Sequence, residues 1–411
     1  ESDKSGVSKE QTDTENKKEI VYSDEEGKSK PITEKVVMPV IEGAIITAQG
    51  AKDSTVNYTA DTVSDPAESF SDPSAASLSQ TKTGGSPMRE FKKSSKLDNV
   101  LYDVRGPVVE EANRMEACGT QVLKLNIGNP APFGFRTPDE VIYDMSHQLT
   151  DCEGYSPSQG LFSARKAIMQ YAQLKKLPNV SIDDIYTGNG VSELINLCMS
   201  ALLDDGDEIL IPSPDYPLWT ACATLAGGKA VHYICDEQSE WYPDIDDMRK
   251  KITDRTKAIV IINPNNPTGV LYPKELLLEI IQIARESGLL IFADEIYDRL
   301  VMDGKQHISL ASLTEDVPVI TLNGLSKSHC LCGYRCGWMV ISGPRELTED
   351  YRQGIIQLTS LRLCANTLAQ IVIPAALDDM DTPASMVRPA ESMSSVKQPF
   401  VNLRRSTVCH L

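Results

Sequence analysis

Apolar residues recur with two spacings along the chain from Met88 onwards. Continuous apolar runs, which are typical of strands buried on both faces, occur at 122–127, 208–211, 257–262, 288–293, 317–322 and 337–342. Helical spacing occurs at 160–174 and 274–287. Because strands and helices alternate, the pattern predicts an α/β domain with a mainly parallel sheet. The strand at 208–211 is expected to end at Pro212.

Residues 1–87 have a different composition. They are rich in Ser, Thr, Asp, Glu and Lys, so they cannot bury enough apolar surface to offset the entropy of the chain. We therefore expect an acidic, low-complexity extension that is mostly disordered. The β-branched segment 36–48 is an exception that could form a strand or two. It resembles part of the ring-building domain of stage III sporulation protein AG.

Length and charge narrow the classes of function. The chain has 411 residues, which is enough for two or more domains, and a formal net charge of -18. Nucleic acid and anionic membranes are disfavoured as partners, because neutralising phosphates needs clustered Lys and Arg. The sequence has no run of about 18 apolar residues, so we expect no transmembrane helix. Residues 1–30 are too acidic and polar for a secretory signal. We expect a cytoplasmic protein.

The ten cysteines lack the regular spacing of a disulfide framework, so we expect mainly reduced core residues. Cys330, Cys332 and Cys336 form a C-x-C-x3-C pattern beside Lys327. A metal site is conceivable there, but thiolate zinc sites usually have a fourth ligand and a C-x2-C spacing. We expect no metal.

Polar segments follow three of the predicted strands directly. Residues 263–269 follow one strand, 294–297 follow the next, and Ser326 with Lys327 comes after a third. In parallel sheets, ligands bind at the carboxyl ends of the strands. The three segments therefore predict one site at that edge of the sheet.

A lysine amine at such an edge can attack a bound carbonyl compound. If that compound were an aldehyde cofactor with a pyridine ring and a phosphate, nearby residues would have to meet the needs of each part. Lys327 would attack the aldehyde, and a buried Asp294 would keep the ring nitrogen protonated. Tyr297 and Asn266 can donate hydrogen bonds to the ring oxygen, and Tyr216 offers a flat stacking partner. Taken singly, each residue also has a structural explanation, such as a helix cap for Asp294, a turn for Asn266 or core packing for Tyr216.

The phosphate of such a cofactor needs backbone N–H groups at the start of a helix, together with fixed cations and hydroxyls. The glycine-rich segment 188–194 leads into an apolar helix and offers the first. Ser326 and Arg335 offer the second. Alternatively, Arg335 could form a surface ion pair and Gly190 could be an ordinary loop glycine.

Together these motifs resemble the class I aminotransferases of fold type I, which depend on pyridoxal phosphate, and within them the bacterial glutamate-pyruvate (alanine) aminotransferases. The resemblance covers residues 88 to about 378 and implies a three-layer αβα fold. It rests on the segments 124–134, 188–194, 214–219, 263–269, 293–297 and 323–338.

The resemblance implies pyridoxal 5'-phosphate as the cofactor, bound to Lys327 as a Schiff base. Lys327 would then move a proton between the substrate α-carbon and the cofactor. Asp294 would pair with the ring nitrogen, Tyr297 and Asn266 with the ring oxygen, and Tyr216 would stack on the ring. The phosphate would be held by Gly190, Val191, Ser192, Ser326 and Arg335.

Two further roles follow from the same resemblance. Tyr155 would reach the phosphate of a partner subunit, which implies a homodimer. Gly128, with Asn266, would border the amino acid and 2-oxo acid substrates.

The sequence departs from the family at Cys330 and Cys332, where relatives have a basic or polar residue and a small residue. The larger departure is at the carboxyl end, where we expect a truncated small domain. Its missing part would carry the arginine that binds the substrate α-carboxylate. None of the available arginines lies in that motif: Arg362, Arg388, Arg404 and Arg405.

The expected domains are an extension at 1–87, an N-terminal segment of the small domain at 88–135, a cofactor-binding large domain at 136–378, and an incomplete small domain with a divergent tail at 379–411. The expected function is transfer of an amino group between alanine or glutamate and pyruvate or 2-oxoglutarate. Two alternatives stay open: a truncated product that binds the cofactor but is catalytically impaired, and a C–S β-lyase on the same fold.

Overall fold

The computed structural model describes residues 90–100, 106–125 and 127–387, together with the backbone of three short strands at 22–23, 29–30 and 45–47. The chain divides into two compact units, Glu1–Pro39 and Val40–Leu411. In the first, β1 (Tyr22–Ser23) pairs antiparallel with β2 (Ser29–Lys30). Most of the extension expected to be disordered and the tail after residue 387 lie outside the described residues.

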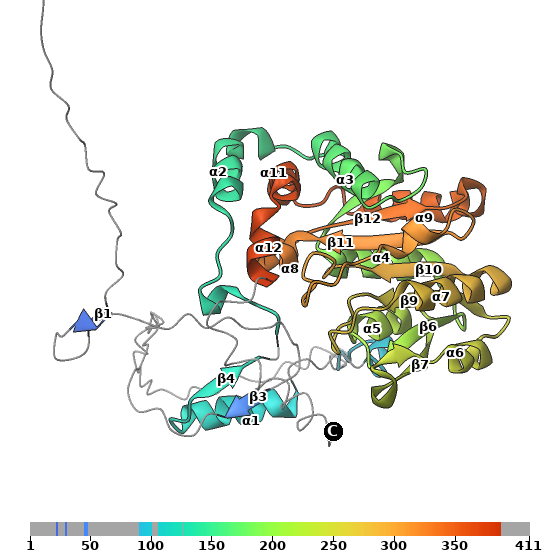
Figure 1. The fold of residues 1–411 in the computed structure, drawn as a ribbon, viewed down its shortest axis with the longest axis horizontal. Coiled ribbons are helices and arrows are strands. Elements are labelled where there is room, and N and C mark those ends of the chain that lie inside the picture. The colour runs from blue at the N-terminus through green and yellow to red at the C-terminus, as the bar shows by residue number, and fades with distance from the viewer. Residues whose placement is uncertain are drawn as a thin grey trace, which may run out of the picture. The chain divides into compact units, whose positions relative to one another are not determined.

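An eight-stranded sheet organises the second unit (Figure 1). In spatial order its strands are β5 (Ile185–Asn189), β12 (Cys336–Ser342), β11 (Val319–Gly324), β10 (Leu290–Asp294), β9 (Thr256–Ile262), β6 (Glu208–Ser213), β7 (Lys229–Asp236) and β8 (Tyr242–Pro243). Neighbours from β11 to β7 are parallel. β12 is antiparallel to both β5 and β11, and β8 is antiparallel to β7. The prediction of a mainly parallel sheet is confirmed.

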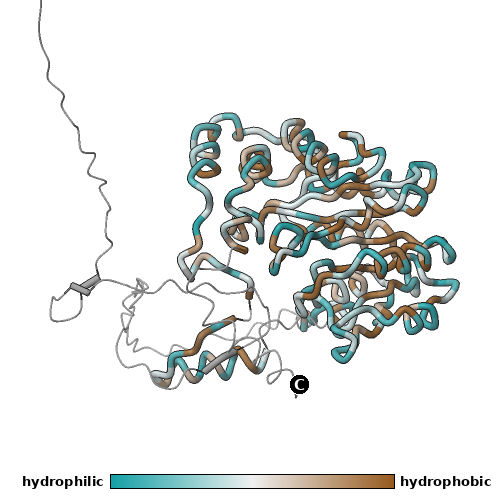
Figure 2. Tube along the Cα trace, in the orientation of Figure 1, coloured by the Kyte–Doolittle hydropathy of each residue, from teal (hydrophilic) through white to brown (hydrophobic). Residues whose placement is uncertain are grey.

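Helices cover both faces of the sheet and give the domain three layers (Figure 1). One core includes residues of α2 (Asp139–His147), α3 (Phe162–Leu174), α6 (Ile245–Lys251), α7 (Lys274–Ser287) and α11 (Ile373–Asp378). The other includes residues of α4 (Val191–Leu202), α5 (Leu218–Leu225) and α9 (Glu349–Leu361). In β9, Ile259 and Ile261 belong to the first core, whereas Val260 and Ile262 belong to the second. Successive side chains point to opposite faces, so a strand covered on both sides reads as one apolar run (Figure 2).

The predicted helix at 274–287 is confirmed at both ends by α7. Its buried face includes Leu277, Ile280 and Ile281, which are spaced as a helix requires. Gly288 follows in a left-handed conformation with φ 67°, where glycine carries little steric penalty. The helix therefore ends at Ser287, and β10 begins at Leu290 rather than at residue 288 as we expected.

β6 continues to Ser213, past the proline at which we expected it to end. Pro212 has no N–H to donate to a neighbouring strand. β9 pairs with β6 from Glu208 to Leu210, so Pro212 lies beyond that ladder and pairs with β7 alone. The missing donor is tolerated because one side of the strand is open at that point.

The other elements include the predicted strand near residue 122, which is β4 (Val122–Lys124) and is shorter than expected. It pairs antiparallel with β3 (Ile45–Thr47), inside the segment where we expected a strand. The other α-helices in the described part of the chain are α1 (Pro107–Ala117), α8 (Leu325–Ser328), α10 (Thr367–Ile371) and α12 (Asp381–Val387).

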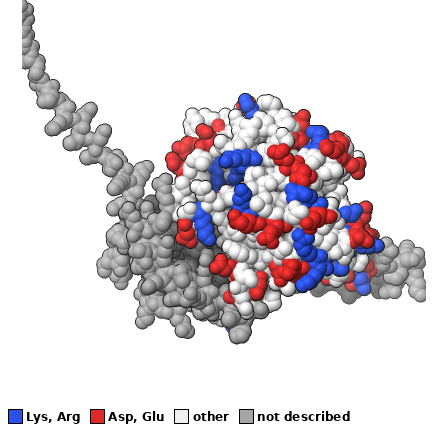
Figure 3. Space-filling model, turned by 45° about the vertical axis from the view of Figure 1, so that its right-hand side comes forward, with Lys and Arg blue, Asp and Glu red and all other residues white. Residues whose placement is uncertain are grey.

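Lysines and arginines are scattered among aspartates and glutamates on the face drawn in Figure 3, which shows no basic stripe. Among the described residues, no helix combines the length and apolar character needed to cross a membrane.

Candidate active site

Three parallel strands end side by side at one edge of the sheet. β10 lies between β9 and β11, and Asp294, its last residue, pairs with Ile262 and Leu322. The loop after β9 begins at Asn263, whose N–H donates to the Asp294 carbonyl at 3.0 Å. The polar segments after these strands therefore lie together, as the strand pattern predicted.

Lys327 lies in α8, directly after β11. Its Nζ atom lies 3.3 Å from the Gly128 carbonyl oxygen and 5.8 Å from the centre of the Tyr297 ring. The structure thus brings together three residues that the sequence nominated from separate segments.

Asp294 is buried, with 4% of its surface exposed. Its carboxylate accepts hydrogen bonds from the Ile296 N–H and the Trp219 indole N–H, both at 3.3 Å. Burial raises the pKa of Asp294 to about 6, and the charge of Glu295 adds to the rise, while the two hydrogen bonds and Lys327 oppose it. A cation bound next to this carboxylate would stabilise its ionised form.

The N-terminus of α4 is approached closely by β12 and by Arg335. A Cβ atom added to Gly337 would lie 2.6 Å from the Val191 nitrogen, and one added to Gly190 would lie 2.4 Å from Arg335 Nη2. Glycine at both positions permits these contacts. The first N–H groups of a helix, here those of Val191 and Ser192, have no partner within the helix, and its dipole favours an anion. This end of α4, with Arg335, is suited to hold a phosphate.

Asn266 and Tyr216 are partly buried in loops that leave the same edge of the sheet. Asn266 lies in the loop after β9. Tyr216 precedes α5, and its carbonyl accepts a hydrogen bond from the Trp219 N–H at 3.1 Å. The side chain of Trp219 contacts Asp294, so this tryptophan connects the Tyr216 loop to the buried carboxylate.

Ser326 is buried beside Lys327, and its carbonyl accepts a hydrogen bond from the Cys332 thiol at 2.9 Å. The same thiol lies 3.5 Å from the Gly128 carbonyl. Cys330 Sγ contacts Met386 Sδ at 3.8 Å, and burial raises the pKa of this thiol to about 11. Cys330 is therefore a poor nucleophile at neutral pH.

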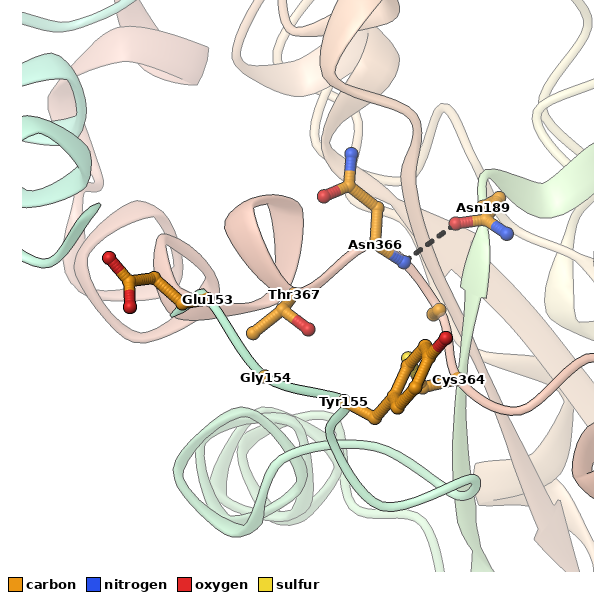
Figure 4. A pocket seen from close by; sticks show the side chains of 8 residues that line it. Glu153, Gly154, Tyr155, Asn189, Cys364, Asn366 and Thr367 are labelled. Carbon is orange, nitrogen blue, oxygen red and sulfur yellow. Dashed lines mark hydrogen bonds between the residues drawn. The ribbon is translucent and has the colours of Figure 1, made fainter. Parts of the chain in front are cut away.

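Tyr155 is 84% exposed and borders a shallow surface pocket (Figure 4). The pocket is lined by Glu153, Gly154, Tyr155, Asn189, Cys364, Ala365, Asn366 and Thr367. The Asn366 N–H donates to the Asn189 side chain at 2.8 Å, and Asn189 directly precedes Gly190. The pocket thus borders the turn into α4, and the Tyr155 ring is open to contact by another molecule.

Arg362 is committed to contacts within the domain. Its guanidinium pairs with Glu193 and donates to the carbonyls of Ser158 at 3.1 Å and Thr187 at 2.8 Å. We assign it no contact with a substrate carboxylate. The other three arginines considered lie outside the described residues.

A buried cluster of ionisable residues that begins directly after Asp294 was not predicted from the sequence. It consists of Lys175, Glu295, Asp298 and His307. Glu295 and Asp298 lie close to Asp294 along the chain, which was a usable signal. Lys175 is 123 positions from Asp298 and directly follows α3, so no spacing rule connects it to this site.

The donor set fits a cofactor with an aldehyde, a cationic ring nitrogen and a phosphate. Lys327 offers an amine, Asp294 offers a buried carboxylate whose raised pKa would be lowered by a cation, and the glycine-lined end of α4 offers space and N–H groups for an anion. These three features lie on elements that meet at one edge of the sheet.

Comparison with known proteins gives two family matches. The model for class I and II aminotransferases matches residues 120–401. The model for the SpoIIIAG C-terminal domain matches residues 1–63, which include the segment 36–48.

Two curated relatives are similar over most of their length. The glutamate-pyruvate aminotransferase AlaA of Escherichia coli (strain K12) is 56% identical over 302 residues, covering 74% of this chain and 75% of that protein. The alanine aminotransferase of Mycobacterium tuberculosis (strain ATCC 25618 / H37Rv) is 52% identical over 302 residues, covering 73% and 70%.

Solved structures give the same picture. An aminotransferase from Escherichia coli superposes with a TM-score of 0.73 at 54% identity, covering 77% of this chain and 78% of that one. The alanine aminotransferase from Pyrococcus furiosus gives a TM-score of 0.71 at 40% identity, covering 76% and 78%.

Proposed function

Because the chain belongs to the class I and II aminotransferase family, we propose that it moves an amino group between alanine or glutamate and pyruvate or 2-oxoglutarate with pyridoxal 5'-phosphate as cofactor. The observation that carries the proposal is the position of the Lys327 amine at the edge of the sheet where the buried Asp294 ends the neighbouring strand. The names of the two curated relatives support the choice of substrates.

When bound, the cofactor supplies an aldehyde that takes up and returns the amino group and a ring that accepts electrons. Asp294 would hold a proton on the ring nitrogen. Tyr297 and Asn266 would donate hydrogen bonds to the ring oxygen, and Tyr216 would stack on the ring. Lys327 would bind the cofactor covalently and move a proton to and from the substrate α-carbon.

The phosphate would be oriented by the start of α4 and by nearby cationic and hydroxyl groups. The residues proposed to hold it are Gly190, Val191, Ser192, Ser326 and Arg335. Gly128 and Asn266 would border the substrate. We further propose a homodimer in which Tyr155, exposed on one subunit, contacts the phosphate bound by the other.

Absorbance of the bound cofactor tests the proposal. The purified 411-residue chain mixed with pyridoxal phosphate should show an absorbance band of the covalently bound cofactor, and alanine with 2-oxoglutarate should then yield pyruvate. Lys327→Ala should remove both signals. Lys274→Ala, an exposed lysine at the start of α7, is the matched control and should change neither.

Other outcomes separate the alternatives. A band without pyruvate formation would favour a product that binds the cofactor but is impaired in turnover. Pyruvate released from cystathionine without an amino acceptor would favour a β-lyase. Absence of any band in the unmutated chain would refute the proposed function.

A further inference from the structure

A buried ion cluster begins at Glu295, the residue that directly follows Asp294 in the sequence. The Lys175 ammonium pairs with the Asp298 carboxylate and lies 3.6 Å from Glu295 Oε2. The side chains of Glu295 and Asp298 are 2% and 1% exposed. Charges buried this deeply interact more strongly than charges in water, so each one influences its neighbours.

Neutral His307 connects the ammonium to the loop that contains Asn266. Its Nε2 atom lies 3.1 Å from the Asn263 carbonyl oxygen, which can only accept, so Nε2 carries the hydrogen. Its Nδ1 atom is then free of hydrogen and accepts from the Lys175 ammonium at 3.1 Å. Burial is the largest cause that lowers the pKa of His307, and the charge of Lys175 also lowers it. Glu295 and Asp298 oppose the change without reversing it, in agreement with a neutral ring.

Glu295 depends on Lys175 for its charge balance. Its Oε1 atom accepts hydrogen bonds from the Ser309 hydroxyl at 2.9 Å and the Leu310 N–H at 3.0 Å. Its Oε2 atom has no hydrogen-bond donor within the described part of the chain. Lys175 Nζ, at 3.6 Å, is a cation near enough to offset its charge. Glu295, Asp298 and His307 are three potential metal ligands. Lys175 Nζ lies near all three, so the cluster already contains a cation.

The charges of the cluster cancel when both of its cations are counted. Arg299 is the second cation: its Nε donates to the Tyr171 hydroxyl at 3.3 Å, and that hydroxyl donates to Asp298. Lys175 and Arg299 thus balance Glu295 and Asp298. The charge of Asp294 is opposed by that of Lys327, and the ring nitrogen of the proposed cofactor would be a second cation beside it. Arg299 also faces His329, whose pKa its charge lowers, and Asp379, whose carbonyl accepts from Arg299 Nη1 at 3.1 Å.

We propose that Lys175 is a positioning residue that offsets the charge of Glu295 and so favours the ionised form of Asp294 opposite the ring of the bound cofactor, while Asp298, which holds the Lys175 ammonium, limits this effect through its own negative charge. The proposal rests on the proposed function, because it concerns the same cofactor. It also gives the cluster a role that packing alone would not require. A neutral apolar set of similar volume would fill the space without the desolvation cost of four charges.

Two substitutions of opposite sign test the proposal. Lys175→Met removes a positive charge, which favours the protonated forms of Asp294 and of the bound cofactor. The pH midpoint of the cofactor's absorbance change should therefore rise. Asp298→Asn removes a negative charge at nearly constant shape, so the midpoint should fall. Each shift should be on the order of half to one pH unit. Asp316→Asn, in an exposed ion pair with Arg285, is the control and should leave the midpoint unchanged.

Midpoints that move in the same direction, or stay equal to the unmutated value, would overturn the proposal, since a purely structural role predicts no opposite shifts. If Lys175→Met does not fold, the downward shift of Asp298→Asn decides alone. Failure of the proposed function itself is distinct, because the unmutated chain would then show no cofactor band to titrate.

Discussion

Asp294→Asn should stabilise the cofactor-free protein at alkaline pH while weakening cofactor binding. Asparagine has nearly the same shape and can still accept a hydrogen bond from Trp219, but it cannot carry a buried charge. The pKa of Asp294 is raised from 3.8 to about 6 in the folded protein, first of all because burial penalises the ionised form. The ionised carboxylate therefore costs the empty site part of its stability.

The magnitude follows from the shift. A rise of roughly two pKa units corresponds to about 3 kcal/mol. Because the folded value is the higher one, stability from this group is fully present below the unfolded pKa of about 4 and is lost as the pH rises towards 6. The unmutated protein should thus be less stable than Asp294→Asn by up to about 3 kcal/mol at pH 8, and by roughly half of that at pH 5.

Urea unfolding of both cofactor-free proteins at pH 8 and pH 5 measures the effect, with the difference between the two pH values as the decisive quantity. Any packing effect of asparagine that is the same at both pH values cancels in this difference. The reasoning would be refuted if the advantage of Asp294→Asn stayed constant or grew as the pH fell. Addition of pyridoxal phosphate should reverse the order at pH 8, because asparagine cannot hold the ring nitrogen protonated.

Two further substitutions test the surroundings of the site. Gly337→Ala places a methyl group 2.6 Å from the first nitrogen of α4, so it should cost about 1–3 kcal/mol of stability and weaken cofactor binding. In the control, Gly333→Ala, the added methyl group meets no atom within 4 Å, so neither effect is expected. A thermal melt and a cofactor titration measure the two effects. Arg352→Met leaves the buried Asp184, now 2.6 Å from the arginine, without its close partner and should cost about 3–5 kcal/mol in urea unfolding. Arg345→Met, which removes a more exposed arginine 3.6 Å from the same carboxylate, should cost less than about 1 kcal/mol; equal losses would contradict the role of burial.

The sequence predicted the strand-end residues because each follows an apolar run directly. Asp294 and Lys327 needed no knowledge of strand order, since all parallel strands of a sheet end at one edge. Lys327 Nζ lies 5.8 Å from the centre of the Tyr297 ring, so the segments after β10 and β11 do lie near each other. The site residues that directly follow a strand, such as Asp294 and Lys327, could therefore be predicted from the local sequence pattern alone.

Strand direction was not accessible in the same way. β12 is antiparallel to both of its neighbours, yet all of its residues from Cys336 to Ser342 are buried. Its apolar run therefore looks like that of a parallel strand. β7 was missed for the opposite reason: much of it is partly exposed, so it lacks a continuous apolar run. Burial, which the sequence pattern reports, does not encode direction.

Long-range partners of the site residues were also hidden. Trp219 reaches Asp294 across 75 positions, and Lys175 reaches Asp298 across 123. Such contacts depend on which helix covers which face of the sheet. Lys175 alone would be read as a solvated helix end, since the helical pattern ends at Leu174.

The long-range contacts of Trp219 and Lys175 both affect the charge balance around Asp294. Asp294 is ionised at a cost in the empty site, and the neighbouring Glu295 adds to that cost. Lys175 offsets the charge of Glu295, and its polar contacts are with Glu295, Asp298 and His307 and not with the Asp294 carboxylate, among the described residues. The excess negative charge is therefore confined to the one carboxylate at the strand end, where Lys327 opposes it only in part. A bound cation there would relieve it, so cofactor binding and folding stability should be coupled through a single residue.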